Sequence, residues 1–296
     1  MNDLRRLPGE PEAAVGAVAR PRHGWSLRHQ AIGLVGVVER NLYLTKRYFL
    51  WDVAFFVWTV ANTLTIVFIA KGIEAAGGDI DVNQAATTLL VGAVIWAYLG
   101  IIFEIVTETV AWERWEGTIE YTFMAPLARP VHLIGMGAYG ILYGLIRAVL
   151  LFAACAFFFD LTMPAADFVA AIVVLLVASI SFVGIGMMTA VLPLISPEKG
   201  SQLGFMAQGI LLVVSGVYYS VEVLPGWMQA VAVVSPATYA LRGIRAAVLD
   251  GAGLGSLGTE LLALLVIGVV SIPTGLWVFG RGELYAKRHG KLKRSG

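Results

Sequence analysis

Long apolar segments alternate with short polar ones along most of this chain. Six of them reach or approach the roughly 20 apolar residues that one helical crossing of a bilayer requires. They cover residues 49–70, 85–106, 132–159, 168–192, 204–221 and 258–280. The third is long and is expected to tilt, whereas the fifth is short. The pattern predicts an all-α polytopic membrane protein whose six transmembrane helices make up residues 49–280.

An amphipathic segment precedes the first span, at residues 26–48. Its apolar positions recur at helical spacing and are Leu27, Ala31, Leu34, Val35, Val38 and Leu42. We expect an N-terminal amphipathic interface helix that lies along the inner surface of the bilayer. A solvated helix that packs on a cytoplasmic partner is the alternative. Residues 1–25 are polar, lack the apolar region of a signal peptide, and are expected to form a flexible cytoplasmic tail.

Composition and charge agree with a membrane protein. Of 296 residues, 58% are hydrophobic and 14% are charged, against about 25% charged in ordinary soluble domains. A net charge of +1 gives no reason to expect a nucleic-acid partner. Most Lys and Arg residues lie before residue 49, in 107–131 and in a basic tail at 281–296. The positive-inside rule therefore predicts a multi-pass protein of the plasma (inner) membrane with both termini and residues 107–131 in the cytoplasm.

The segment between the second and third spans, residues 107–131, is unusually rich in charge. Its side chains form two helical stripes, which are Trp112, Trp115, Ile119 and Phe123 on one side and Glu113, Glu116 and Glu120 on the other. Gly117 permits a sharp break in the middle, and Pro126 bars continuation. We expect a short helix with its aromatic face toward the membrane and its acidic face toward water. An ordinary loop whose charges only solvate it is the alternative.

Residues 222–251, after the fifth span, form the second unusual segment. Pro225, Gly226 and Pro236 interrupt it too often for a full crossing, yet it is too apolar for a free loop. We expect a re-entrant pair of short helices, broken at Ser235–Pro236, that dips into the outer leaflet and returns. A plain interfacial hairpin held by Trp227 and Tyr239 is the alternative.

Two sequence motifs carry a family resemblance. ERWEGTIEYTFMAPL at 113–127 resembles the signature of the membrane subunits of ATP-binding-cassette exporters of the type-two permease family. VEVLPGWMQAVAVVSPATYALRGIRAAVLDG, at 221–251, resembles the pattern that this family shows after its fifth span. The number of spans and the helix before the first one match as well. The resemblance covers about residues 26–285.

The resemblance implies partners and roles for named residues. Residues 107–131 would contain a cytoplasmic coupling helix that docks on a separate nucleotide-binding ATPase subunit through Glu113, Arg114, Glu116, Gly117, Thr118, Glu120 and Pro126. The segment 222–251 would form a gate outside, through Leu224, Pro225, Trp227, Ser235, Pro236, Tyr239 and Arg245. Family members work as two permeases, so a homodimer or a heterodimer with a paralogue is implied, with two ATPase subunits.

The chain contains no GxxxxGK[ST] phosphate loop, so ATP and Mg would be bound by the partner subunit and this chain needs no cofactor. We therefore expect a transport subunit that is not itself an enzyme. It would export an amphipathic, lipid-like, drug-like or glycan-linked substrate. A secondary transporter driven by an ion gradient is the alternative, although that class usually shows broken helices in both halves.

Charged residues within spans are costly and often functional. Asp52 and Glu104 lie near the cytoplasmic ends of the first two spans, and Arg147 lies deep in the third. Arg147 either lines a path for an anionic substrate or forms a structural ion pair with Glu104 or another carboxylate. No His or Cys shows metal-ligand spacing, so no metal site is expected, and the single Cys155 is expected to be a small buried hydrophobic residue.

Overall fold

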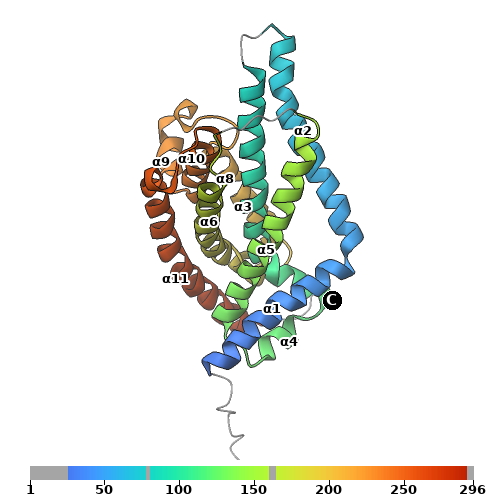
Figure 1. Cartoon of the computed structure of the whole chain (residues 1–296). Helices are drawn as coiled ribbons and strands as arrows, with labels where there is room; N and C mark the ends of the chain where they lie inside the picture. Colours follow the sequence, from blue (N-terminus) through green and yellow to red (C-terminus); the bar gives the residue numbers. More distant parts are fainter. Residues whose placement is uncertain (1–25, 78–80, 160–164, 292–296) are drawn as a thin grey trace, which may run out of the picture.

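The structure, a computed structural model, describes residues 26–77, 81–159 and 165–291, and this part of the chain is helical throughout with no strand (Figure 1). The tail expected at residues 1–25 lies outside the described residues, as do residues 292–296. The α-helices are α1 Leu27–Arg47, α2 Phe49–Ala75, α3 Val82–Glu116, α4 Ile119–Met124, α5 Arg129–Ala156, α6 Phe168–Thr189, α7 Val191–Ile195, α8 Gly200–Val214, α9 Gly226–Ala232, α10 Pro236–Leu249 and α11 Gly258–Arg288, with 3-10 turns at Val221–Val223 and Leu254–Ser256.

Five segments of the described chain are long and apolar enough to cross a membrane: α2, α3, α5, α6 continued by α7, and α11. They correspond to every predicted span except the fifth. That span corresponds to α8, whose 15 residues extend about 22 Å, less than the roughly 30 Å of a hydrocarbon core. The helix ends early because Gly216 takes a left-handed backbone conformation at φ +71°. A crossing by α8 therefore stays a prediction.

The central helix is α3, which packs against α2, α5, α6, α8 and α10. Beside it, α6 and α11 make the closest helix pair. A Cβ atom on Gly184 would lie 2.2 Å from the Ser271 hydroxyl oxygen, and one on Gly275 would lie 2.6 Å from the Gly184 carbonyl oxygen. Only glycine permits this approach, so these small residues serve helix packing. Cys155 is buried, as expected.

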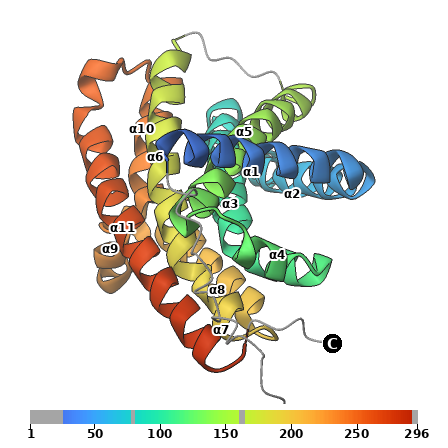
Figure 2. The ribbon, with the colours of Figure 1, turned by 90° about the horizontal axis from the view of Figure 1, so that it is seen from below.

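The two unusual segments lie at opposite ends of the bundle (Figure 1). Helices α1 and α4 and the C-terminal end of α11 share one end, where α1 crosses beneath the bundle (Figure 2), and α9 and α10 lie at the other. The expected C-terminal tail is partly helical, because α11 continues to Arg288. Beyond α11, Lys291 donates from its ammonium group to the Ile195 carbonyl oxygen at 2.8 Å.

Helix α1 packs along α5, with Val37 against Gly135, where a Cβ atom would lie only 2.9 Å from the valine. The apolar positions Leu27, Val35 and Leu42 stay exposed. No described residue covers this stripe, so its geometry suits an interface helix with its apolar side in lipid.

Candidate functional site

Helix α3 continues beyond its apolar run into the charged segment 107–131. Helix α3 runs to Glu116 because residues 107–116 contain no Gly or Pro and include the good helix formers Ala, Arg and Glu. Gly117 then breaks it with a left-handed φ of +74°, and the amide of Thr118 donates to the Glu113 carbonyl oxygen at 2.8 Å. The break expected at Gly117 is confirmed. The two side-chain stripes therefore belong to two helices, α3 and the six-residue α4, and not to one.

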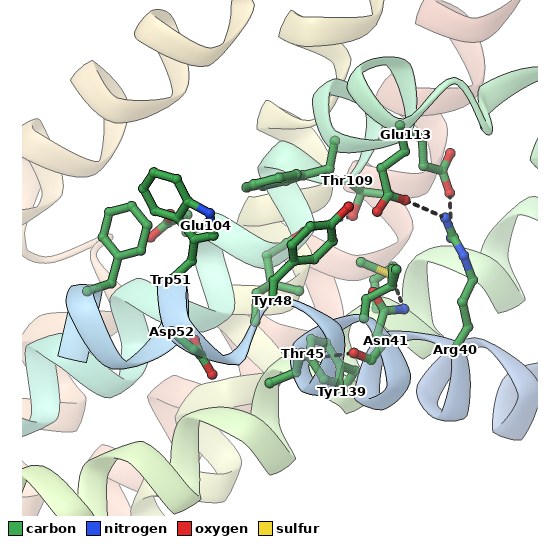
Figure 3. Close-up of a pocket in the computed structure, with 16 residues that line it drawn as sticks. Arg40, Asn41, Thr45, Tyr48, Trp51, Asp52, Glu104, Thr109, Glu113 and Tyr139 are labelled. Atoms are coloured by element: carbon green, nitrogen blue, oxygen red, sulfur yellow. Dashed lines mark hydrogen bonds and ion pairs between the residues drawn. The ribbon is translucent and has the colours of Figure 1, made fainter.

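A buried polar network fixes this break to α1 (Figure 3). The Arg40 guanidinium donates to carboxylate oxygens of Glu113 at 3.2 Å and Glu116 at 3.3 Å, and to the Thr118 hydroxyl at 3.1 Å. The same Glu113 oxygen accepts from the Thr122 hydroxyl at 3.1 Å. It also lies 3.2 Å from the ring nitrogen Nε2 of His132, on α5. One carboxylate thus joins α1, α3, α4 and α5.

The predicted acidic stripe facing water is therefore wrong for Glu113, which is only 3% exposed. Arg114 is 6% exposed and points inward as well, donating to the Leu194 carbonyl oxygen at 3.0 Å. Helices α1 and α7 cover these side chains. The prediction failed because the periodicity of one helix does not show which of its faces a neighbouring helix covers. Glu120 alone of the acidic stripe is fully exposed, since Glu116 is half-buried in its pair with Arg40.

Hydrogen bonds also fix the C-terminal end of α4. The Arg129 guanidinium donates to the carbonyl oxygens of Thr122 at 2.8 Å and Phe123 at 2.6 Å, which are among the last carbonyl groups of α4. It also lies 4.1 Å from the centre of the Phe123 ring. A further bond of 3.4 Å joins Arg129 to Glu283 on α11. Cationic groups of this kind stabilise the C-terminal end of a helix.

The outer face of α4 remains free. Ile119 is buried against the bundle, which leaves the opposite side of the short helix uncovered. Tyr121 and Met124 are 72% and 73% exposed, next to the exposed Glu120 and Pro126. The sequence analysis missed Tyr121 and Met124. Their position opposite the one apolar residue that α4 buries was the available signal, but only the fold shows which side that is.

Two adjoining cavities follow α3 inward from this network. The smaller, of about 230 Å³, lies between α1, α2, α3 and α5 and is drawn in Figure 3. The larger, of about 540 Å³, lies between α2, α3, α5 and α8. They share lining residues, which are Asp52, Phe55, Glu104, Ile105 and Trp112. A mainly apolar path that carries several charged groups therefore leads from the α4 end toward the middle of the bundle.

The intramembrane charges meet in the larger cavity. The Arg147 guanidinium lies 3.6 Å from an Asp52 carboxylate oxygen and donates to the Tyr143 hydroxyl at 2.9 Å. The Tyr143 hydroxyl also bonds Asp52. Of the two carboxylates that the sequence offered, the structure pairs Arg147 with Asp52 and not with Glu104. Both readings of Arg147 have support, since the paired guanidinium also lines the cavity.

At the opposite end, α9 and α10 form the expected pair of short helices, broken at Ser235–Pro236. The Ser235 hydroxyl is buried and lies 2.7 Å from that of Ser215, just after α8. Tyr239 donates from its hydroxyl to the Val233 carbonyl oxygen at 2.8 Å, which closes the hairpin. Trp227 and Pro225 are exposed and Leu224 is half-buried.

Arg245 ties this pair to the end of α8. Its guanidinium donates to the Gly216 carbonyl oxygen at 3.0 Å and to that of Val217. These carbonyl groups lack helical partners because α8 has ended, so the arginine satisfies them. A third cavity, of about 430 Å³, opens beside this contact and is lined by Arg245, Arg242 and Glu222 among others. Arg245 thus positions the segment that was predicted to gate the outer side.

A family model described as ABC-2 type transporter matches residues 40–249, which is most of the chain. The match includes the network around Glu113, all of α4 and the pair α9–α10. Among curated proteins, none matches this chain. Members of this family are membrane components of ABC transporters, so the match argues against the secondary-transporter alternative. The chain therefore belongs to the ABC-2 type transporter family and is a membrane subunit of an ABC transporter.

Proposed function

We propose that this chain is the permease of an ATP-driven exporter and that a separate ATPase subunit docks on α4. The clamped position of α4 carries the proposal. The helix has only six residues and would not be stable alone. Arg40 holds its start and Arg129 holds its end, yet its outer face is free. A short helix that is fixed at both ends and exposed on its outer face is suited to bind a partner and to transmit that partner's movement.

The docking surface consists of Glu120, Tyr121, Met124 and Pro126. Two large apolar side chains beside a carboxylate suit a cleft with an apolar floor and a basic rim, because exposed aromatic and Met side chains are favoured anchors at interfaces. Glu113 and Arg114 contribute by positioning this surface and not by touching the partner. Gly117 and Thr118 set the angle at which α4 leaves α3, and Glu116 helps to hold it there.

Movement of α4 would reach most of the bundle. Arg40 connects it to α1, Arg129 connects it to α5 and α11, and Gly117 connects it to the central helix α3. Closure of two ATPase subunits would rock two permease copies as rigid bodies, either a homodimer or a heterodimer with a paralogue. Helices α9 and α10, with Arg245, would gate the outer side. The protein would lie in the plasma (inner) membrane with both termini cytoplasmic.

The test is complex formation with a Walker-motif ATPase, which the proposal expects to be encoded beside this chain. We expect the two to co-purify and to hydrolyse ATP. Replacing both Tyr121 and Met124 by Ala should lower the co-purified ATPase at least about tenfold, the loss of two interface anchors. Tyr43→Ala, which removes an equally exposed tyrosine from α1, is the matched control and should have no effect. A stable complex with the double variant would refute docking on α4.

A further inference from the structure

The larger cavity beside α3 is lined by polar groups that form no hydrogen bond or ion pair with the described residues. Glu104 lines both inner cavities, yet its carboxylate forms no hydrogen bond or ion pair with any described residue. The Gln208 amide, from α8, and the Thr63 hydroxyl, from α2, also line the larger cavity without a bond to the described part of the chain. Thr63 is only 4% exposed. Buried polar groups are nearly always paired, so the Thr63 hydroxyl points to a ligand in this cavity, to which the Glu104 carboxylate is also exposed.

The charge of the two inner cavities is unbalanced. Two guanidinium groups, Arg40 and Arg147, line them together with four carboxylates, Asp52, Glu104, Glu113 and Glu116. Arg40 and Arg147 each already lie against carboxylates. Glu104 is the carboxylate that forms no ion pair with a described residue, and the Arg147 charge that acts on it at longer range is already paired with Asp52. The outer cavity has no such excess, because Arg242 and Arg245 there stand against Glu222 and Asp250.

Aromatic rings line the same cavity as Glu104. Trp58 of α2, Trp96 and Trp112 of α3, and Tyr218 after α8 line the larger cavity. Tyr98, by contrast, is buried away from it and bonds Ser179 at 2.7 Å. The faces of indole and phenol rings attract organic cations, the more strongly when water is excluded. A carboxylate among aromatic rings is therefore a fitting environment for a cationic group on an apolar molecule.

We infer that the larger cavity binds the positively charged end of an amphipathic organic cation, with Glu104 as its counter-ion. This inference rests on the proposed function, whose substrate class it narrows. An anionic head group would meet an excess of carboxylates, because Asp52 already neutralises Arg147. An uncharged polyol would stack on the rings but would not balance the negative charge of Glu104. The excess of negative charge at the α4 end would favour loading of a cation from that side.

Two dyes of matched shape test this inference. Rhodamine 6G is a cation, and rhodamine 19 is the same ring system with a free carboxylate in place of the ester and no net charge. Binding of each to the full chain in lipid nanodiscs is measured by fluorescence anisotropy against empty nanodiscs. We expect rhodamine 6G to bind at least about tenfold more tightly than rhodamine 19, a difference of about 1.4 kcal/mol. Glu104→Gln should remove most of that difference.

Glu74→Gln provides the matched control, because Glu74 is exposed at the far end of α2 and lines no cavity described here. If Glu104→Gln does not yield folded protein, the comparison of the two dyes on the unaltered chain still tests whether the cavity prefers a cation. Absence of rhodamine 6G binding, equal affinity for both dyes, or an unchanged affinity in Glu104→Gln would each overturn the inference. The assay contains no ATPase subunit, so its failure leaves docking on α4 standing. Failure of docking would in turn leave the cation site standing.

Discussion

Replacing Arg40 by Ala is the sharpest test of the network that fixes α4. The change removes both ion pairs and the bond to the Thr118 hydroxyl in one step. Glu113 would keep only Thr122 and His132 as partners, although its side chain is almost fully buried. Glu116 would lose its only ion pair with a described residue. We therefore expect the contact between α1 and the α3–α4 break to loosen.

The size of the effect follows from burial. Breaking a fully buried ion pair by removing one partner costs about 3–5 kcal/mol, whereas an exposed pair contributes about 0–1 kcal/mol. The Arg40 side chain is 34% exposed, while that of Glu113 is 4% exposed. The pair thus lies between these limits. Since Glu113 keeps a neutral donor in Thr122, we expect a loss of about 2 kcal/mol.

Equilibrium unfolding in a denaturing detergent, followed by circular dichroism, measures this loss. Arg28→Ala is the matched control, because Arg28 lies on the same helix, is exposed and forms no ion pair with a described residue. The double variant of Arg40→Ala with Glu113→Gln should recover part of the loss, since no unpaired carboxylate is then left buried. In the assembled transporter, Arg40→Ala should also lower ATP-dependent transport more than ATP hydrolysis, because α4 would move without α1.

The reasoning would be refuted by equal stability of Arg40→Ala and Arg28→Ala, within about 0.5 kcal/mol. It would also be refuted by full additivity of the Arg40 and Glu113 changes in the double variant. Either result would mean that the two side chains do not share one network.

Three further changes probe other parts of the structure. Gly117→Ala should cost about 1 kcal/mol in the same unfolding assay, because φ at this position is +74° and Ala disfavours it. Gly184→Ala should cost about 2 kcal/mol or more, because its Cβ would collide with Ser271, while Gly280→Ala on α11 meets open space and should cost almost nothing. Arg245→Gln should leave two carbonyl groups after α8 without donors and accelerate proteolysis of that turn in reconstituted protein, with little effect on ATPase docking.

Single-helix patterns predicted the elements of this protein well. Apolar runs of membrane-spanning length located α2, α3, α5, α6 and α11, because each must bury its own backbone hydrogen bonds in lipid whatever its neighbours are. Pro236 and Gly117 placed two breaks for reasons that are equally local. The predicted bounds of the fifth span differ from those of α8, because a run of apolar residues continues past Val214 while the helix does not. The left-handed Gly216 ends it, and glycine is common enough inside spans that its presence alone was no signal.

The candidate site was predicted less well, because it depends on which helices meet. The sequence by itself determined that Glu113, Glu116 and Glu120 lie near a break in a charged segment between two spans. Only the tertiary structure decided that α1 covers Glu113 and leaves Tyr121 and Met124 bare, that Arg147 pairs with Asp52, and that Glu104 forms no ion pair with a described residue. The physical reason is the separation along the chain over which each kind of interaction acts. Backbone hydrogen bonding and helix punctuation act within a few residues, whereas burial and ion pairing join positions such as Arg40 and Glu113, which only packing brings together.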